Sequence, residues 1–447
     1  MKYGSFTYNE NEYLFTIDNG KMKVANKNGI DVIKMFLSWN KKATFVKSLQ
    51  YLEVRFFPLA NKGIIFHQDS LEFIDGGEFI DIIGYIEFEN EKEEINGASI
   101  EFEELNYYLD TNKSISNIDY SEDGINIALS KSIKTSKKSF KVKNKKIEYW
   151  YELNNQYNNK SKDIFSLATT INFDFGDKVD DYSLLTDVYN INHIYFSYIS
   201  QRQNIVDNII TLLSIKKDNI TKVGKFVFNK KKDININMNI SPEEIEEHII
   251  RYDNIEPIES KMFESIAKHE LFLRHIPRNQ VERNQISDGR FLSHTSGFEW
   301  EFDQMYPNGI HKESTINKSI KLSKKLDTLE FDSWEKGIIR NTKKHMLDIS
   351  LEAKMNKVYE DLHTFSVPIL NQILSLNEVN DKKSIFKEVN ELRNNFAHGE
   401  IKIDYGSDGI LGIIYLERMI YVMQLKRLGL DDENIKKCIN SLFTIIF

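Results

Sequence analysis

A short segment of the chain combines three side-chain types that suit the cleavage of RNA. Arg393, Asn394 and His398 lie within six consecutive residues. Histidine moves protons near neutral pH because its unperturbed pKa is about 6.5. The planar, always charged guanidinium of arginine forms paired hydrogen bonds with a phosphate, and asparagine can orient the imidazole or hold the phosphate. We therefore take these three residues as candidate catalytic residues.

RNA can be cut without a metal ion when its own 2′-hydroxyl attacks the adjacent phosphate. This reaction needs a base for the hydroxyl proton, an acid for the leaving 5′-oxygen and positive charge beside the phosphate. One histidine cannot be base and acid in the same step, so a two-fold dimer that joins two motifs would supply the second. On a straight helix Asn394 and His398 share a face, whereas Arg393 and His398 lie about 140° apart. Gly399 predicts that the helix ends or bends here, which would turn His398.

A purely structural explanation of this segment stays open. Arg393 and His398 can be surface residues at a helix end, where the helix dipole stabilises a charged histidine without any catalysis. The basic stretch Lys131–Lys146 has two explanations as well. It can bind RNA, or it can be a solvated edge strand whose lysines block pairing with another sheet.

A second basic group precedes the helical part of the chain. Arg274, Arg278 and Arg283 lie close together in the sequence, with His269 and His275 nearby. We consider the three arginines as RNA-binding residues because arginine recognises phosphate. The alternative is an exposed segment between helices.

Apolar residues at spacings of three and four predict helices in the C-terminal part of the chain. Pro242 suits the first turn of a helix, Gly429 suits a helix end, and Asp431 suits the start of the last helix. The helix that carries the candidate motif shows one apolar stripe, and an earlier helix shows another: Ile385, Val389, Leu392 and Phe396; Leu351, Met355, Val358 and Leu362.

The N-terminal part alternates between apolar and polar residues, which predicts strands with one buried and one wet face. The clearest strands are expected over Phe79–Phe88, Ile125–Leu129, Ile147–Leu153 and Ile171–Phe175, and one helix is expected over about Ile205–Ile215. The fold class is therefore α+β and multidomain. Sandwich-like sheets are expected over residues 1–240, which can divide into subdomains of about 1–115 and 116–240. An all-α domain is expected over 257–447, beyond a boundary near 253–257.

The composition of the chain excludes several classes of protein and several kinds of site. The formal net charge is −8, which argues against a protein that coats nucleic acid through bulk charge. Cys438 is the single cysteine, so neither an internal disulfide nor a cysteine-based zinc site can form. The first residues lack the apolar core of a signal peptide, and no apolar run is long enough to span a bilayer. We expect a cytoplasmic protein with no metal, no cofactor and no membrane contact.

Two segments carry a resemblance to a known family. The segment Glu391–Gly399 resembles the Arg-Asn-x-x-x-His signature of the HEPN superfamily. The segment Phe291–Glu299, in which a Phe-Leu pair leads to a Glu, resembles the first core helix of that family. His294, Trp300 and Glu301 depart from its ordinary pattern.

Most of the chain resembles the ApeA-like group of anti-phage proteins, in which a β-rich region precedes a HEPN domain. The segments Gly84–Leu109 and Ile171–Ile199 look like that N-terminal region.

The resemblance implies a metal-independent HEPN endoribonuclease that acts as a toxic effector in anti-phage abortive infection. It implies an RNA substrate such as tRNA, a homodimer through the helical domain, and Glu299 as a supporting residue of the site. The N-terminal region would sense a phage-derived trigger or regulate the nuclease. The alternative is a non-catalytic HEPN module that binds RNA, nucleotide or a partner protein. Some members of the family lose the motif and keep the fold, whereas this chain keeps Arg393, Asn394 and His398.

Overall fold

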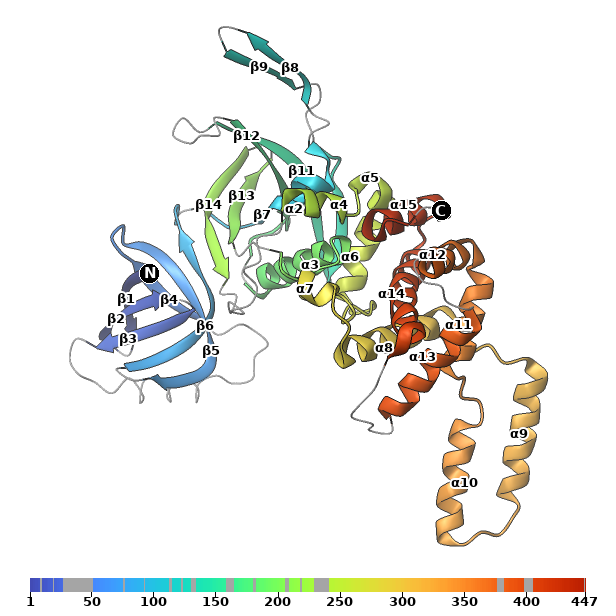
Figure 1. Cartoon of the computed structure of the whole chain (residues 1–447). Helices are drawn as coiled ribbons and strands as arrows, with labels where there is room; N and C mark the ends of the chain where they lie inside the picture. The colour runs from blue at the N-terminus through green and yellow to red at the C-terminus, as the bar shows by residue number, and fades with distance from the viewer. Residues whose placement is uncertain are drawn as a thin grey trace. The chain divides into compact units, whose positions relative to one another are not determined.

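The computed structural model describes two compact units, Met1–Glu270 and Leu271–Phe447 (Figure 1). The first unit is rich in strands and the second is helical, which confirms the expected α+β class. The description covers the chain apart from residues 9, 19, 27–50, 75–76, 92, 112–114, 122–123, 130–133, 158–164, 180–181, 206–208, 218, 229–240, 376–381, 398–404 and 446.

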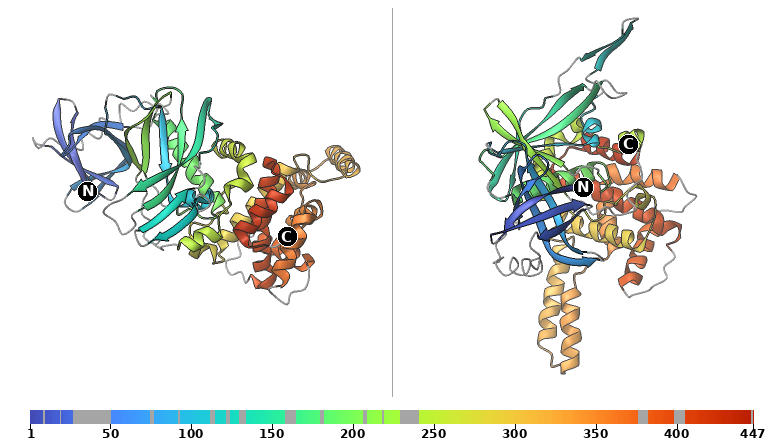
Figure 2. Two further views of the ribbon diagram at one scale, coloured as in Figure 1. Left: turned by 90° about the horizontal axis from the view of Figure 1, so that it is seen from above. Right: turned by 90° about the vertical axis from the view of Figure 1, so that its left-hand side faces the viewer.

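The first six strands of unit 1 close into an antiparallel barrel. They pair in the order β6-β3-β2-β1-β4-β5, and β5 pairs with β6 to complete the ring, which the left view of Figure 2 shows at the N-terminus. Alternate residues such as Tyr13, Phe15 and Ile17 fill its core. The strands are β1 (Lys2–Tyr8), β2 (Asn11–Asp18), β3 (Lys21–Asn26), β4 (Tyr51–Phe56), β5 (Asn61–Ile74) and β6 (Gly77–Phe88).

Strand β6 also belongs to an open antiparallel sheet, because its last residues pair with β14. Gly84 makes this pairing possible, since a Cβ there would lie 2.4 Å from the backbone oxygen of Val227. The order of the open sheet is β10-β11-β12-β7-β13-β14-β6. Its further strands are β7 (Gly97–Glu101), β10 (Lys138–Val142), β11 (Lys145–Tyr157), β12 (Phe165–Asp174), β13 (Ile209–Lys216) and β14 (Asn219–Phe228).

This arrangement differs from the sandwich-like sheets expected from the sequence. One continuous sheet runs through the barrel and the open part, because β6 is long enough to pair in both. The sheet also crosses the expected subdomain limit near residue 115, since β7 pairs with β12 and β13. A hairpin of β8 (Ile115–Ser121) and β9 (Gly124–Leu129) lies apart from this sheet.

The prediction of a helix over about Ile205–Ile215 is wrong. Residues Ile209–Lys216 form β13, between β7 and β14. The helix of this region is α3 (Ser183–Ile199), whose many aromatic and β-branched residues have the composition of a strand. Helix α3 packs with α6 (Glu259–Ala267) on the open sheet, where α2 (Glu103–Tyr108) also lies (Figure 1).

Short helices connect the sheet to the helical unit. Helix α4 (Pro242–Glu247) begins as expected, because the Ser241 hydroxyl accepts a hydrogen bond from the backbone N–H of Glu244. Then follow α5 (Tyr252–Ile255) and the 3-10 helix η2 (Glu256–Ile258). Compact unit 1 continues through α6 to Glu270, so the segment 257–270, assigned from the sequence to the helical domain, packs with the sheet.

Unit 2 is a bundle around α14 (Gly406–Leu428), which packs against α8, α12, α13 and α15. Helix α14 ends at Gly429, which has a φ of 95°, and Asp431 caps α15, as the sequence predicted. The remaining helices are α7 (Gln280–Arg283), α8 (Asp288–Met305), α9 (Glu313–Asp327), α10 (Ser333–His345), α11 (Leu351–Asp361), α12 (His363–Ser375), α13 (Lys382–Ala397) and α15 (Asp432–Phe443).

Helices α9 and α10 form an arm of unit 2, which we call the helical arm (residues 313–345). They run side by side away from the other helices of the unit (Figures 1 and 2), and neither contains a buried residue. Across all the described residues, no helix combines the length and the apolar character that crossing a membrane requires.

Candidate functional site

A pocket of about 530 Å³ in unit 2 brings together residues from three helices. Helix α13 contributes Arg393 and Asn394, and helix α8 contributes Glu299. These are three of the residues selected from the sequence, and they come from two distant segments. The pocket is completed by Asp303, Leu347, Asp348, Ile349, Ser350, Leu351, Lys354 and Asn390.

Helix α13 presents its polar face to this pocket because its opposite face is buried. Asn390, Arg393 and Asn394 have the spacing of three and four that places side chains on one face of a helix. Three members of the expected apolar stripe, Ile385, Val389 and Leu392, are buried, whereas Phe396 is only partly buried. The stripe of α11 is buried throughout. The rotation of α13 about its axis is therefore fixed by its core contacts.

Glu299 joins the two cations of the pocket. Its Oε2 lies 3.5 Å from Arg393 Nη2, and its Oε1 lies 3.8 Å from Lys354 Nζ. Lys354 Nζ also lies 3.1 Å from Asp303 Oδ1. The Lys354 side chain is only 12% exposed, whereas that of Arg393 is 41% exposed. Arg393 is thus held in place and still accessible to a ligand.

An aromatic contact fixes the end of α13 against α8. The ring of Phe396 stacks on that of Phe291, with centroids 5.1 Å apart. The hydroxyl of Tyr405 donates a hydrogen bond of 2.5 Å to Asp288 at the start of α8. His398 lies between these two anchor points in the sequence and falls outside the described residues, so its predicted role stays a prediction.

Buried polar groups hold α8 against α14 on the side away from the pocket. Glu301 is fully buried and accepts hydrogen bonds from Arg427, from Gln424 and from the backbone N–H of Phe272. About three turns earlier in α8, Arg290 Nη2 lies 3.1 Å from Glu417 Oε2 of α14. These contacts fix the position of α8, and with it that of Glu299, along α14.

Two histidines lie in the same buried region. His294 Nε2 is 3.4 Å from Glu417 Oε1, and the ring of His275 packs edge-on against that of Tyr421. Burial, together with the charge of His294, lowers the pKa of His275 to about 3. Burial by itself raises the pKa of Glu417, but the hydrogen bond from His294 and the charges of His294 and Arg290 lower it to about 2.

The three arginines proposed to bind RNA lie elsewhere. Arg274 and Arg278 are exposed, and Arg283 donates a hydrogen bond of 3.2 Å to the backbone oxygen of Leu442 in α15. None of the three is among the described residues that line the pocket. Arg283 therefore has a structural contact, and the RNA-binding role of the group stays a prediction.

No protein-family model, curated protein or solved structure matches this chain. The resemblance to the HEPN superfamily consequently rests on the residues of the two sequence segments. Within the part of the chain that the structure describes, no group of three His, Cys, Asp or Glu side chains is arranged to hold a metal ion.

Sequence reasoning missed several residues of the pocket. Asp303 follows Glu299 by one helical turn, and Asn390 precedes Asn394 by one turn, so both could have been found from the helical spacing. Lys354 carries no such signal. It reaches Glu299 only because α11 packs against α8, which is a tertiary contact.

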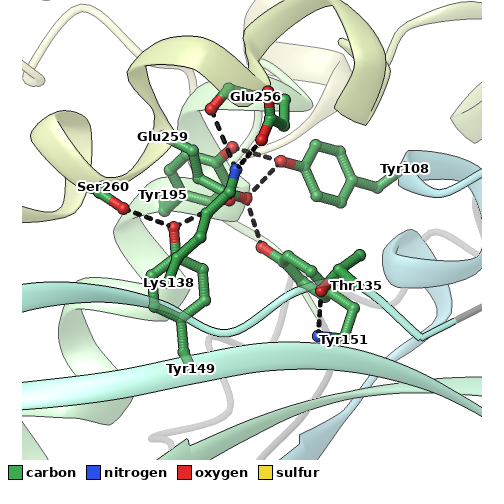
Figure 3. Close-up of polar contacts among 9 residues, drawn as sticks. All are labelled: Tyr108, Thr135, Lys138, Tyr149, Tyr151, Tyr195, Glu256, Glu259 and Ser260. Atoms are coloured by element: carbon green, nitrogen blue, oxygen red, sulfur yellow. Dashed lines mark hydrogen bonds and ion pairs between the residues drawn. The ribbon is translucent and has the colours of Figure 1, made fainter.

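A second polar cluster lies in unit 1 and is closed to solvent. The carboxylate of Glu259 in α6 accepts hydrogen bonds from the hydroxyls of Tyr108, Tyr149 and Tyr151, at distances of 2.6, 2.9 and 2.5 Å (Figure 3). Lys138 Nζ lies 3.3 Å from the same carboxylate. Burial, followed by the charge of Glu259, raises the pKa of each of the three tyrosines. The cluster joins α6 to the sheet, and the burial of Glu259 and its three tyrosine partners suits a structural role.

Two further sequence features also have structural explanations. Part of the basic stretch Lys131–Lys146 forms β10, which is an edge strand of the open sheet. This position agrees with the explanation in which lysines protect a sheet edge. Cys438 is buried in α15, and burial raises the pKa of its thiol. Buried thiols of this kind are unreactive because the thiolate is the nucleophile.

Proposed function

We propose that the helical unit of this chain is a metal-independent endoribonuclease of the HEPN type. The proposal is carried by one observation: Glu299, Arg393 and Asn394, selected from two separate sequence segments, line one pocket. Residues that are merely exposed at helix ends have no reason to converge in this way. Arg393 offers the pocket a positive charge suited to a phosphate, with Lys354 beside it.

In the proposed reaction, the 2′-oxygen of one nucleotide bonds to the adjacent phosphorus while the bond from that phosphorus to the 5′-oxygen breaks. A base takes the 2′-hydroxyl proton, and an acid gives a proton to the leaving 5′-oxygen. The products end in a 2′,3′-cyclic phosphate and a 5′-hydroxyl. We assign the two proton transfers to His398 and to the same residue of a second copy of the chain. Arg393 stabilises the phosphate charge, and Asn394 holds the phosphate or orients an imidazole.

The resemblance to ApeA-like proteins suggests the biological setting. In this proposal the enzyme is a cytoplasmic, toxic effector of anti-phage abortive infection, and its substrate is a structured RNA such as tRNA. Unit 1 would detect a phage-derived trigger or regulate the nuclease. The division of the chain into two compact units supports this role, because a separate unit is available for it.

The second candidate function is a non-catalytic HEPN module that binds RNA, nucleotide or a partner protein. It is favoured by the charge of the pocket, where the carboxylates of Glu299, Asp303 and Asp348 accompany the cations of Lys354 and Arg393. Carboxylates close to a bound phosphate weaken its binding through like-charge repulsion. Cleavage of RNA separates the two candidates, because a binding module leaves the RNA intact.

The test uses the purified full chain with total RNA in excess EDTA, and it measures both cleavage and the chemistry of the new ends. We expect cleavage with 2′,3′-cyclic phosphate ends. His398→Ala and Arg393→Ala should each lower the rate about a hundredfold or more, because they remove a proton-transfer group and a phosphate ligand. Lys437→Ala, which removes an exposed cation of α15 outside the pocket, is the control and should cut at the normal rate.

Expression in a bacterial host gives a second readout of the same proposal. The intact chain should be toxic on activation, and the His398→Ala chain should not. Ends that carry a 3′-hydroxyl, or strict dependence on Mg²⁺, would refute the 2′-hydroxyl mechanism. Wild-type rates for both His398→Ala and Arg393→Ala would refute the site.

A further inference from the structure

The helical arm is a basic surface of unit 2. Its sequence, residues 313–345, contains eight Lys and Arg and five Asp and Glu, a net charge of +3 in a chain of net charge −8. The two helices contain no buried residue, so this charge is displayed on both of them. A local basic surface on an acidic protein attracts polyanions to one place.

The cations of the arm form two stripes. Lys318, Lys321 and Lys325 follow one another along α9 at spacings of three and four residues. Lys336, Arg340 and Lys344 follow along α10 at spacings of four residues. Each stripe therefore keeps to one face of its helix, as a row of contacts to a phosphate backbone requires.

These side chains are exposed and have no carboxylate partner among the described residues. Several cations elsewhere in unit 2 are paired instead, since Lys354, Lys387 and Lys426 each form an ion pair. Within the arm, Lys343 pairs with Asp327 and thereby links α10 to α9. Unpaired cations can exchange their counterions for phosphates without breaking an internal ion pair.

An aromatic side chain accompanies the cations. Trp334 lies in the first turn of α10, next to the turn that joins the two helices, and is 73% exposed. An exposed tryptophan beside a basic stripe has the composition of a single-strand binding surface, where bases stack on aromatic rings.

Both ends of the arm reach the candidate pocket. The arm is inserted between α8, which supplies Glu299 and Asp303, and α11, which supplies Lys354. The residues directly after α10, Leu347 to Leu351, line the pocket themselves. His311 Nε2 lies 2.9 Å from the backbone oxygen of Leu347, so the two ends of the arm are joined at the pocket.

We propose that the helical arm binds the phosphate backbone of single-stranded RNA, or of single-stranded parts of a folded RNA, and leads it to the pocket of Arg393. This inference rests on the proposed ribonuclease function for the identity of the polyanion. The arm supplies affinity without sequence specificity, and the pocket supplies the chemistry. The apolar side chains that the arm also exposes, such as Ile320 and Ile338, make a second copy of the chain the competing partner.

Binding is measured separately from cleavage with labelled single-stranded 2′-O-methyl RNA, which lacks the attacking hydroxyl. The test variant replaces Lys321, Lys325, Lys336 and Lys344 by Gln in the full chain. The matched control replaces Lys178, Lys216, Lys222 and Lys268 of unit 1 by Gln, which changes the net charge equally. Each control lysine is exposed and has a carboxylate partner. Circular dichroism and thermal unfolding check that both variants fold.

We expect the arm variant to bind about tenfold or more weakly at low salt, and the control to bind within about twofold of the wild type. The slope of log affinity against log salt should become less steep by about 3, since each phosphate contact to a single strand contributes about 0.7. Trp334→Ala should lower the affinity about fivefold or more and leave this slope unchanged, because stacking releases no counterion.

The proposal is overturned if the arm variant binds as the wild type does, or if the arm variant and the control lose affinity equally. Unchanged RNA binding together with a changed oligomeric state would assign the arm to contact between copies of the chain, and would also overturn it. Cleavage of ordinary RNA is scored independently. Arm-dependent binding without cleavage would refute the proposed ribonuclease function and support the arm proposal. Normal cleavage with unchanged KM in the arm variant would support the ribonuclease function and refute the arm proposal.

Discussion

The Nη2 atom of Arg393 lies 3.5 Å from the Oε2 atom of Glu299. This contact joins α13 to α8 at the surface of the pocket, and it links the two sequence segments that resemble the HEPN family. The carboxylate can orient the guanidinium, and it also competes with a phosphate for the same cation. These two effects act on different kinetic constants, so they can be separated by experiment.

Glu299→Gln should therefore change binding and catalysis in opposite directions. Removal of the negative charge frees Arg393 to bind phosphate, so KM should fall by about twofold to fivefold. The looser guanidinium stabilises the transition state less well, so kcat should fall by about tenfold. The measurement is steady-state cleavage of an RNA substrate. Asp303→Asn is the matched control, since Asp303 contacts Lys354 and not Arg393 in the described ion pairs. A Glu299→Gln enzyme with both constants unchanged would contradict a positioning role.

The parts of the fold with strong periodicity could be predicted from the sequence. Strand β6 follows from its β-branched and aromatic residues. Strand β11 follows from a spacing of two, and the buried stripes of α11 and α13 follow from spacings of three and four. The burial of Trp150 was not predicted. Trp150 lies on the face of β11 that was expected to be exposed to solvent, yet it is buried against Leu213 and Ile215 of β13. The sequence of β11 alone does not show that residues of β13 pack on that face.

The elements that the sequence did not predict depend on tertiary contacts. Strand β13 is buried on both faces between β7 and β14, so its apolar residues do not alternate and resemble a helical stripe. The assignment of α6 to unit 1 depends on Glu259, whose three tyrosine partners come from α2 and β11. In the candidate site, Arg393 and Asn394 were recognisable from a local motif, whereas Lys354 depends on the packing of α11 against α8.

The buried cluster in unit 1 predicts a large loss of stability for Glu259→Gln. The amide has no charge to pair with Lys138 and accepts hydrogen bonds less strongly from the three tyrosine hydroxyls. We expect the free energy of unfolding of unit 1 to fall by about 3 kcal/mol. It is measured by thermal or urea unfolding followed through tyrosine circular dichroism. Glu256→Gln, which removes the more exposed partner of Lys138, should cost less than about 1 kcal/mol. Equal effects of the two substitutions would contradict the importance of the buried carboxylate.

The stability of unit 2 should decrease as the pH falls from 7 to 5, because of His275. Its pKa is about 3 in the folded protein and about 6.5 in the unfolded chain. Between these values the unfolded chain binds a proton that the folded chain does not, so acidification favours unfolding. At pH 5 the loss amounts to about 2 kcal/mol. The pKa of Glu417 is lowered to about 2, so protonation of this carboxylate reduces the stability of unit 2 further only below about pH 4.5.

His275→Leu isolates this effect, because it removes the titrating ring and keeps an apolar side chain of similar volume. The unfolding free energy of the variant should depend less on pH between 7 and 5 than that of the wild type. His363→Gln is the control, since His363 is exposed at the start of α12 and forms no ion pair among the described residues. Parallel pH profiles for the wild type and His275→Leu would show that His275 does not titrate as its burial requires.

The last prediction concerns the number of chains in one active site. Each chain offers one His398 and one Arg393, while the proposed reaction moves two protons at two oxygens. Helix α13 is described up to Ala397, and on a straight helix Arg393 and His398 would lie about 140° apart. A two-fold contact would place the arginine of one protomer beside the histidine of its partner. A mixed dimer of a wild-type chain and a His398→Ala chain keeps a single His398, which cannot be base and acid in the same step.

We therefore expect an equal mixture of wild-type and His398→Ala chains to cut RNA, after subunit exchange, at about half the rate of the same mixture before exchange. The controls are the wild type exchanged with itself and the mixture without exchange. The readout is cleavage of total RNA, with the oligomeric state followed by light scattering. An unchanged rate after exchange has occurred would contradict a shared site, as would full activity of a stable monomer.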